Sequence, residues 1–148
     1  MAAGEPGPDE IIAGALVRIR RDQQARHLQR RAAPSGDAAR FRYLDALGGA
    51  GEGLPISRIA ESIGVDRPRA SRLTTELLGE GHIEREPAPG DSRYALIRLT
   101  AQGERLVADM NEHRRRGVAE ALAGFTAEES HTLAVLLRRF VDAWPRTP

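Results

Sequence analysis

The stretch from Leu54 to Gly103 limits the fold of this 148-residue chain more than any other part of it. It opens with two short segments whose apolar residues recur at helical spacing. The first apolar stripe comprises Ile56, Ile59, Ala60 and Ile63, and the second comprises Ala70, Leu73, Leu77 and Leu78. Asp66 suits the start of the second segment, because its carboxylate can accept from the free backbone N–H groups of a first helical turn. Two short helices joined by a tight turn that contains a glycine are typical of a helix-turn-helix.

A two-stranded hairpin is expected directly after this motif. The predicted strands are His82–Glu86 and Arg93–Leu99, and the predicted loop Pro87–Ser92 contains prolines and a glycine that favour a turn. Arg93 beside Asp91 places a cation at a protruding tip. The narrow minor groove of DNA attracts such a cation, because its small width concentrates negative potential.

The exposed face of the second helix, from Asp66 to Gly79, carries side chains suited to nucleic acid. In helix-turn-helix proteins the first residues of this helix reach base edges in the major groove, where Arg forks fit guanine and hydroxyls fit phosphates. The candidate DNA-binding residues are Arg67, Arg69, Ser71, Arg72 and Thr75 on the helix, and Arg85, Asp91 and Arg93 on the hairpin.

At these residues the chain resembles the multiple-antibiotic-resistance regulator (MarR) family of bacterial winged-helix transcription factors. The family's wing pattern, D-x-R followed by L, then L-T and G, is met by Asp91, Arg93, Leu96, Leu99, Thr100 and Gly103. Arg67-Pro68-Arg69 departs from the family, which more often has small hydroxyl residues there, and this leaves the base preference open. The resemblance covers nearly the full length of the chain.

The resemblance implies a sequence-specific DNA-binding transcriptional regulator, most often a repressor, that binds a palindromic operator as a homodimer. Family members often bind small aromatic or acidic ligands between the dimer helices and the winged helix. The candidate ligand-binding residues on this basis are Arg18, His27, Arg42 and Tyr43.

The expected fold class is mainly α with a small β-hairpin wing, flanked by long dimerisation helices. Its parts are a disordered arm at 1–8, a dimerisation helix at 9–33, the winged helix-turn-helix at 34–100 and C-terminal dimerisation helices at 101–148. Within the third part of this series a helix is expected from Asp37, with Gly48–Gly51 as its terminator. Thr126 and Glu129 match a capping box at the start of the last helix, whose apolar stripe runs to Trp144.

Bulk charge does not identify a nucleic-acid binder. The formal net charge is only +1, and from Asp66 to Arg98 six arginines are matched by six acidic residues. The alternative hypothesis is therefore a protein-interaction module that uses the winged helix without binding DNA. An exposed apolar patch at the positions of Arg67, Arg69 and Arg72 would favour that alternative.

The sequence contains no recognisable arrangement of catalytic or metal-binding residues. The chain has no cysteine, its four histidines lie on separate predicted elements, and Gly48–Gly51 lacks the Lys-Ser/Thr of a phosphate loop. We expect neither catalysis nor a metal or cofactor.

No apolar run reaches membrane-spanning length and the first residues do not resemble a signal peptide, so the expected location is the cytoplasm. The expected partners are double-stranded DNA, a second copy of the chain and a small-molecule effector, with no membrane.

Overall fold

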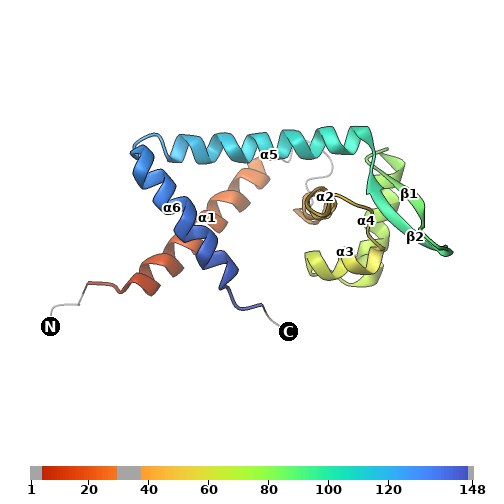
Figure 1. Ribbon diagram of the computed structural model, residues 1–148, viewed down its shortest axis with the longest axis horizontal. Helices are drawn as coiled ribbons and strands as arrows, with labels where there is room; N and C mark the ends of the chain where they lie inside the picture. Colours follow the sequence, from red (N-terminus) through yellow and green to blue (C-terminus); the bar gives the residue numbers. More distant parts are fainter. Residues whose placement is uncertain (1–4, 30–37, 147–148) are drawn as a thin grey trace. The chain divides into compact units, whose positions relative to one another are not determined.

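The computed structural model describes residues 5–29 and 38–146, which form helices and one antiparallel hairpin (Figure 1). The elements follow the order α1 (Pro8–Gln29), α2 (Ala38–Ala50), α3 (Ile56–Ile63), α4 (Arg67–Gly79), β1 (Ile83–Ala88), β2 (Asp91–Leu99), α5 (Ala101–Ala121) and α6 (Ala127–Asp142). The chain divides into two compact units between Glu104 and Arg105. This mainly helical architecture with one small hairpin confirms the predicted fold class. The start of the helix expected at Asp37, the end of the helix expected at 9–33 and the first half of the arm at 1–8 lie outside the described residues.

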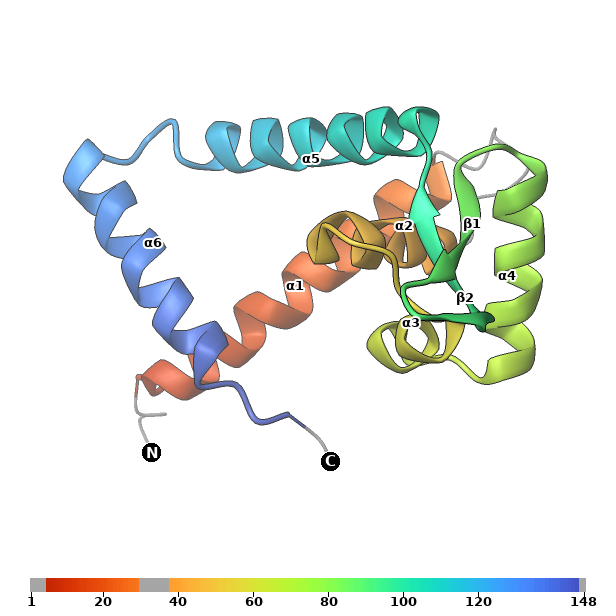
Figure 2. The same ribbon diagram turned by 45° about the vertical axis from the view of Figure 1, so that its right-hand side comes forward.

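A single core holds α2, α3, α4 and the hairpin together (Figure 2). Its buried apolar residues are Ala39, Tyr43, Leu44, Leu47, Ile59, Ala60, Ile63, Ala70, Leu73, Leu77, Ile83 and Ile97. The two stripes predicted from helical spacing supply half of this set, which confirms that the period of the apolar residues defines the buried faces of α3 and α4.

The turn between α3 and α4 follows from two local features of the sequence. Gly64 ends α3 in the left-handed conformation with φ of 68°, which favours a residue without Cβ. Asp66 then caps α4, because its Oδ1 accepts a hydrogen bond of 2.7 Å from the backbone N–H of Arg69. The predicted N-cap is confirmed. Three residues, Gly64, Val65 and Asp66, are enough to connect the helices.

The hairpin is longer than the sequence indicated. The pairing of β1 with β2 runs from Ile83 opposite Leu99 to Ala88 opposite Asp91, so that Pro89 and Gly90 alone form the turn. The predicted loop Pro87–Ser92 was therefore wrong in its bounds, because strand pairing continues past Pro87. Leu54 also pairs with Ile97 through two backbone hydrogen bonds of 2.9 and 2.8 Å, a contact that the sequence pattern did not indicate.

The helix α2 ends within the predicted terminator Gly48–Gly51. Gly48 and Gly49 still lie inside the helix, and Ala50 is its last residue. Gly51 follows with φ of 65°. Glycine lowers helix propensity by only about 1 kcal/mol, and the packing of the preceding turns outweighs that cost.

The second unit contains most of α5 and all of α6. The predicted capping box is confirmed, since Thr126 Oγ1 accepts from the Glu129 backbone N–H and Glu129 Oε1 accepts from the Thr126 backbone N–H, at 3.1 and 2.9 Å. None of the residues described in α6 is buried, and its apolar side chains are exposed. Among the described helices, none has the length and apolar character needed to cross a membrane.

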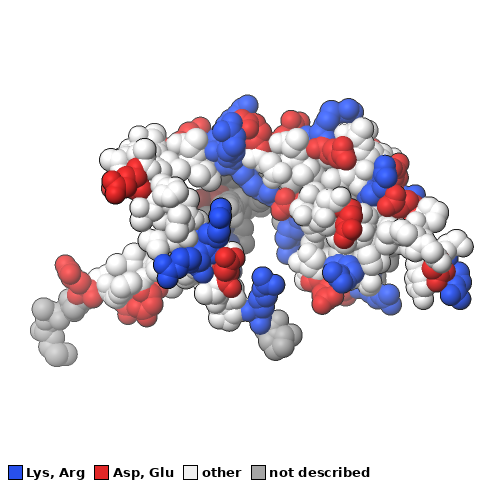
Figure 3. Space-filling model, viewed as in Figure 1, with Lys and Arg blue, Asp and Glu red and all other residues white. Residues whose placement is uncertain are grey.

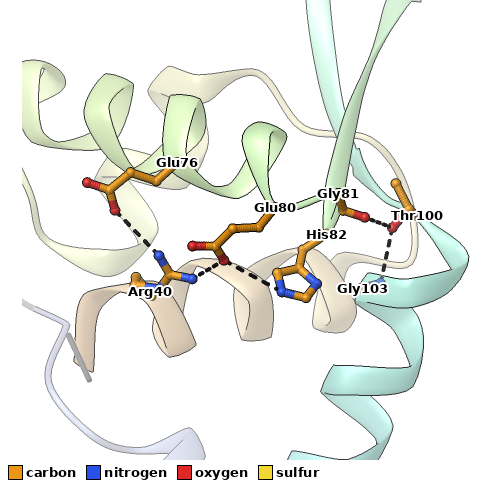
Figure 4. A network of polar contacts seen from close by, with 7 residues as sticks. All are labelled: Arg40, Glu76, Glu80, Gly81, His82, Thr100 and Gly103. Atoms are coloured by element: carbon orange, nitrogen blue, oxygen red, sulfur yellow. Dashed lines mark hydrogen bonds and ion pairs between the residues drawn. The ribbon is translucent and has the colours of Figure 1, made fainter. Parts of the chain in front are cut away.

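A close backbone contact joins the hairpin to the start of α5. The Thr100 hydroxyl donates to the Gly81 carbonyl at 2.6 Å and accepts from the Gly103 backbone N–H at 3.1 Å (Figure 4). A Cβ at residue 103 would lie only 2.0 Å from the His82 carbonyl oxygen. The threonine and glycine of the wing pattern are thus both required by the geometry of this junction.

We predict that Gly103→Ala lowers the free energy of unfolding by about 1–3 kcal/mol, because the added methyl group displaces the His82 carbonyl. Urea unfolding at a fixed protein concentration measures the change. Gly117→Ala is the matched control in the same helix, since a Cβ at residue 117 meets no atom within 4 Å. Equal stability of Gly103→Ala and wild type would contradict this account of the junction.

Candidate nucleic-acid interface

The exposed arc of α4 carries all five predicted reading residues. At about 100° per residue, Arg67, Arg69, Ser71, Arg72 and Thr75 fall on one side of the helix, opposite the buried Ala70, Leu73, Thr74 and Leu77. No hydrogen bond or ion pair of the Arg67 or Arg72 side chain occurs among the residues that the structure describes. The first half of α4 therefore presents cationic side chains to solvent.

Two carboxylates, of Glu76 in α4 and of Glu80 directly after it, are both bound by Arg40 of α2 (Figure 4). The Arg40 guanidinium donates to Glu80 and to Glu76, the latter at 3.5 Å, and only 11% of its side chain is exposed. Hydrogen bonding to Arg40 lowers the pKa of the Glu80 carboxyl, and the same bond raises the pKa of Arg40. Arg40 of α2 therefore compensates the negative charge at the C-terminal end of α4. The uncompensated charge of α4 is positive and lies at its N-terminal end.

A buried pair of hydroxyls attaches α4 to α2 beneath this ion pair. Thr74 Oγ1 donates to the Ala70 carbonyl at 2.8 Å, so its proton is already used. The Tyr43 hydroxyl, 2.7 Å from the same oxygen, must then be the donor of the contact between them. Burial raises the pKa of the Tyr43 phenol and exceeds the opposing effects of the Thr74 bond and the charge of Arg85.

The hairpin places a second ion pair at its tip. Arg93 contacts Asp91 through Nε at 3.0 Å and through a terminal nitrogen at 3.1 Å, and its backbone N–H also donates to this carboxylate. These bonds lower the pKa of Asp91 and raise the pKa of Arg93. The Arg93 side chain is 84% exposed. Asp91 thus holds the exposed Arg93 side chain at the tip of the hairpin.

The remaining charges of the hairpin are largely balanced. Arg98 lies between Glu84 and Glu86, at 2.7 and 3.2 Å, while Arg85 is exposed on β1. On the face drawn in Figure 3, basic and acidic side chains are interspersed and no continuous basic surface forms. Attraction of a polyanion therefore depends on a few exposed arginines rather than on the total charge of the chain.

Of the four residues predicted to bind a ligand, the structure describes the side chains of Arg18, Arg42 and Tyr43, which lie in different surroundings. Tyr43 is 0% exposed and belongs to the core, so its side chain has a packing role in this conformation. Arg42 donates to the Ile63 carbonyl at 3.1 Å and so caps the C-terminal end of α3. Arg18 is exposed on α1, and the side chain of His27 lies outside the described residues.

Sequence reasoning missed the residues whose importance depends on distant partners. Arg40 was not among the predicted site residues, because its partners lie 36 and 40 positions away. His82 was expected only to start a strand, yet its Nε2 lies 3.6 Å from Glu80, and its buried Nδ1 has no hydrogen-bond partner among the described residues. No local signal distinguishes these residues from other polar positions.

Comparison with known proteins identifies the family of this fold. A model described as MarR family matches residues 37–93, which span α2, α3, α4 and the tip of the hairpin. This region of the chain is similar to the MarR family. The match supports a winged-helix transcriptional regulator rather than an enzyme.

Solved structures agree with this assignment over the length of the chain. RV1404 from Mycobacterium tuberculosis is 27% identical, with a TM-score of 0.75 over 99% of this chain and 100% of that one. The PcaV transcriptional regulator from Streptomyces coelicolor, solved with its natural ligand, is 28% identical, with a TM-score of 0.55 over 97% and 99%. FabT from Streptococcus pneumoniae, solved in complex with DNA, shares the fold at 19% identity, with a TM-score of 0.69 over 88% and 93%.

We predict that Arg40→Met lowers the free energy of unfolding at neutral pH by about 1 kcal/mol, because it removes the partner of two carboxylates on a largely exposed rim. Chemical denaturation measures the change. Arg58→Met is the control, since it removes an exposed arginine from the neighbouring helix α3. Identical stabilities of Arg40→Met and wild type would show that Arg40 does not attach α4 to α2.

The pH dependence of the free energy of unfolding is a second test of the Arg40–Glu80 ion pair. The pKa of Glu80 is lowered in the folded state, so its stabilising contribution is complete above the usual value of 4.5 and is lost as the pH falls through the folded-state pKa. Wild type should therefore lose more stability than Arg40→Met on acidification below that value. Parallel acid-unfolding profiles of the two proteins would be inconsistent with this ion pair.

Proposed function

We propose that the chain is a transcriptional repressor that binds a palindromic operator as a homodimer and is released by a small aromatic or acidic ligand. The exposed cationic half of α4, held opposite a buried face, is the observation that carries the DNA-binding part of this proposal. Each subunit would place α4 in a major groove and the Arg93 tip at the adjacent minor groove. A two-fold axis then separates the half-sites by about one helical turn, roughly 34–36 Å.

The surface of α3 and α4 favours DNA over a protein partner. Among the described residues, the exposed large hydrophobic side chains lie on α1, on the hairpin and in the C-terminal unit, and α3 and α4 carry none of them. Protein-protein interfaces have an apolar centre that excludes water, whereas Arg67, Arg69, Ser71 and Arg72 give the exposed arc of α4 charged and hydroxyl side chains. The alternative of an interaction module without DNA binding thus lacks its required patch.

The apolar side chains of α1 and α6 support a homodimer. In α1 the exposed residues are Ile11, Ile12, Leu16, Val17 and Ile19, and in the C-terminal unit they include Leu133, Leu136, Leu137, Val141 and Trp144. Exposed apolar surface of this extent is unfavourable in water and marks an interaction site. A second copy of the chain supplies the same surfaces and can bury them by two-fold symmetry. We propose these helices as the dimerisation helices predicted from the sequence.

The repressor and ligand parts of the proposal draw support from the family and from its solved members. FabT was solved in complex with DNA and PcaV with its natural ligand. A ligand that binds better to one spacing of the two α4 helices would shift the population of dimers towards or away from the DNA-binding state. Effector binding then needs no direct contact with α4.

Selection of bound duplexes from a randomised library tests the proposed function. We expect recovery of a palindromic sequence with half-sites about 10 base pairs apart, since that spacing matches one helical turn. Recovery of a single half-site would contradict the two-fold arrangement. Failure to enrich any sequence would contradict sequence-specific recognition.

We predict different effects for two arginines on binding to the selected duplex. Arg72→Ala should cost about 1–3 kcal/mol on the selected duplex and little on a mixed-sequence duplex, because α4 reads base edges. Arg93→Ala should weaken binding to both duplexes and lower the salt slope by about one, because it removes a cation from the backbone contact. Fluorescence anisotropy across a salt series measures both effects.

Arg146→Ala is the control for this pair, since it removes an exposed positive charge outside the winged helix. It should leave affinity and salt slope near the wild-type values. If Arg72→Ala and Arg93→Ala both bind like wild type, the residues assigned to DNA reading are wrong.

We predict that Leu136→Glu weakens dimerisation at least about tenfold, because it places a charge on the apolar face of α6, where Leu136 is 50% exposed in the single chain. Sedimentation velocity across a concentration series measures the dimer. Arg138→Glu introduces the same side chain on the opposite, polar face and should leave the dimer intact. Equal dissociation of the two variants would show that α6 does not form the interface.

A further inference from the structure

The tip of the hairpin contains three residues without a partner on the opposite strand. Pro87 pairs with Ala95, but the next residue of β1, Ala88, pairs with Asp91. Three residues of β2, Ser92, Arg93 and Tyr94, therefore bulge out between these two pairs. Bulges of this kind redirect side chains away from the plane of the sheet.

Tyr94 is the large apolar side chain that this bulge exposes. Its exposed fraction is 65%, whereas Tyr43, the other tyrosine of the chain, is 0% exposed. Tyr94 belongs neither to the core of the winged helix nor to α1 or α6. The Tyr94 ring therefore lies mostly in solvent, outside the buried core of the fold.

The charges beside Tyr94 cancel each other at the tip. Asp91 binds the Arg93 guanidinium through two side-chain hydrogen bonds, so these two residues together carry no net charge. The ion pair alone therefore attracts a phosphate backbone only weakly. A neighbouring group that binds without charge would add affinity at this point.

We propose that Tyr94 is a further DNA-contacting residue, which packs its ring against a deoxyribose and donates its hydroxyl to a phosphate oxygen beside the minor groove. Tyrosine suits this position because its ring is apolar and its hydroxyl is a hydrogen-bond donor, while sugar and phosphate present both kinds of partner. The inference rests on the proposed placement of the hairpin tip at a minor groove. It identifies a backbone contact that is independent of base sequence and of salt.

Selective nitration tests the proposal on the unmodified full-length protein. Tetranitromethane reacts with exposed tyrosines, so the free protein should be nitrated at Tyr94 and not at the buried Tyr43. Saturating amounts of the selected duplex should slow the nitration of Tyr94 several-fold, as measured by peptide mass spectrometry. Equal rates with and without DNA would overturn the proposal. Protection in the absence of DNA would overturn it too, because the residue would then be covered by protein.

Two substitutions separate the ring from the hydroxyl. Tyr94→Ala should weaken binding about tenfold on both the selected duplex and a mixed-sequence duplex of equal length, and Tyr94→Phe should lose less. The salt slope should stay at the wild-type value in both variants, because no charge is removed. Thermal unfolding at one protein concentration should match wild type, since the side chain is exposed.

The mixed-sequence duplex distinguishes this inference from the proposed function. A wild-type protein that prefers no sequence would refute the proposed regulator, while a loss for Tyr94→Ala on the mixed duplex would still support the backbone contact. Wild-type affinity of Tyr94→Ala on both duplexes would refute the contact alone. A loss confined to the selected duplex would also refute it, because Tyr94 would then read bases.

Discussion

The attachment of α4 to α2 is the contact on which the rest of the winged helix depends. Thr74 is the polar residue buried in this interface, and the Tyr43 hydroxyl donates to it while Thr74 donates to the Ala70 carbonyl. A buried hydroxyl without a partner costs about 1–3 kcal/mol, so this pair favours one orientation of α4 over others. Because one arc of α4 is fixed against the core, the opposite arc must face solvent. The exposure of Arg67 and Arg72 is a consequence of that packing.

Pairing, rather than composition, determines where charge is available on this protein. The net charge of the chain is only +1, but the first half of α4 is cationic. The carboxylates at the other end of α4, of Glu76 and Glu80, are paired with Arg40. The hairpin follows the same principle, since Arg98 compensates two glutamates and Asp91 compensates Arg93. Long-range attraction to DNA is expected to be modest as a result. Recognition then depends on short-range contacts of a few side chains.

The features that the sequence predicted well are those determined by neighbours along the chain. The apolar stripes of α3 and α4, the Asp66 cap and the Thr126–Glu129 capping box all arise within a few residues and were confirmed. The bounds of the hairpin were less predictable, because strand pairing across the turn extended the strands past Pro87 to Ala88 and Asp91. The run Gly48–Gly51 indicated where α2 ends, but it did not indicate that Ala50 is the last residue of the helix.

The candidate site shows the same division between local and distant determinants. The exposure of the predicted residues of α4 follows from helical period, which can be read from the sequence. The packing role of Tyr43 could not be predicted, because it depends on Thr74, 31 positions away. The pairing of Arg40 depends on Glu76 and Glu80, which come close only after α2 and α4 have packed. Helical spacing does not indicate which of several arginines will meet a carboxylate.

The central claim is that a nearly neutral chain recognises a specific DNA sequence through a few exposed arginines on each of two subunits. The most direct test is the salt dependence of its affinity for the selected duplex and for a mixed-sequence duplex of equal length. The account predicts a preference of at least about 10³-fold at physiological salt, together with a linear fall of log K with log salt concentration. Equal affinity for the two duplexes across the salt series would contradict it.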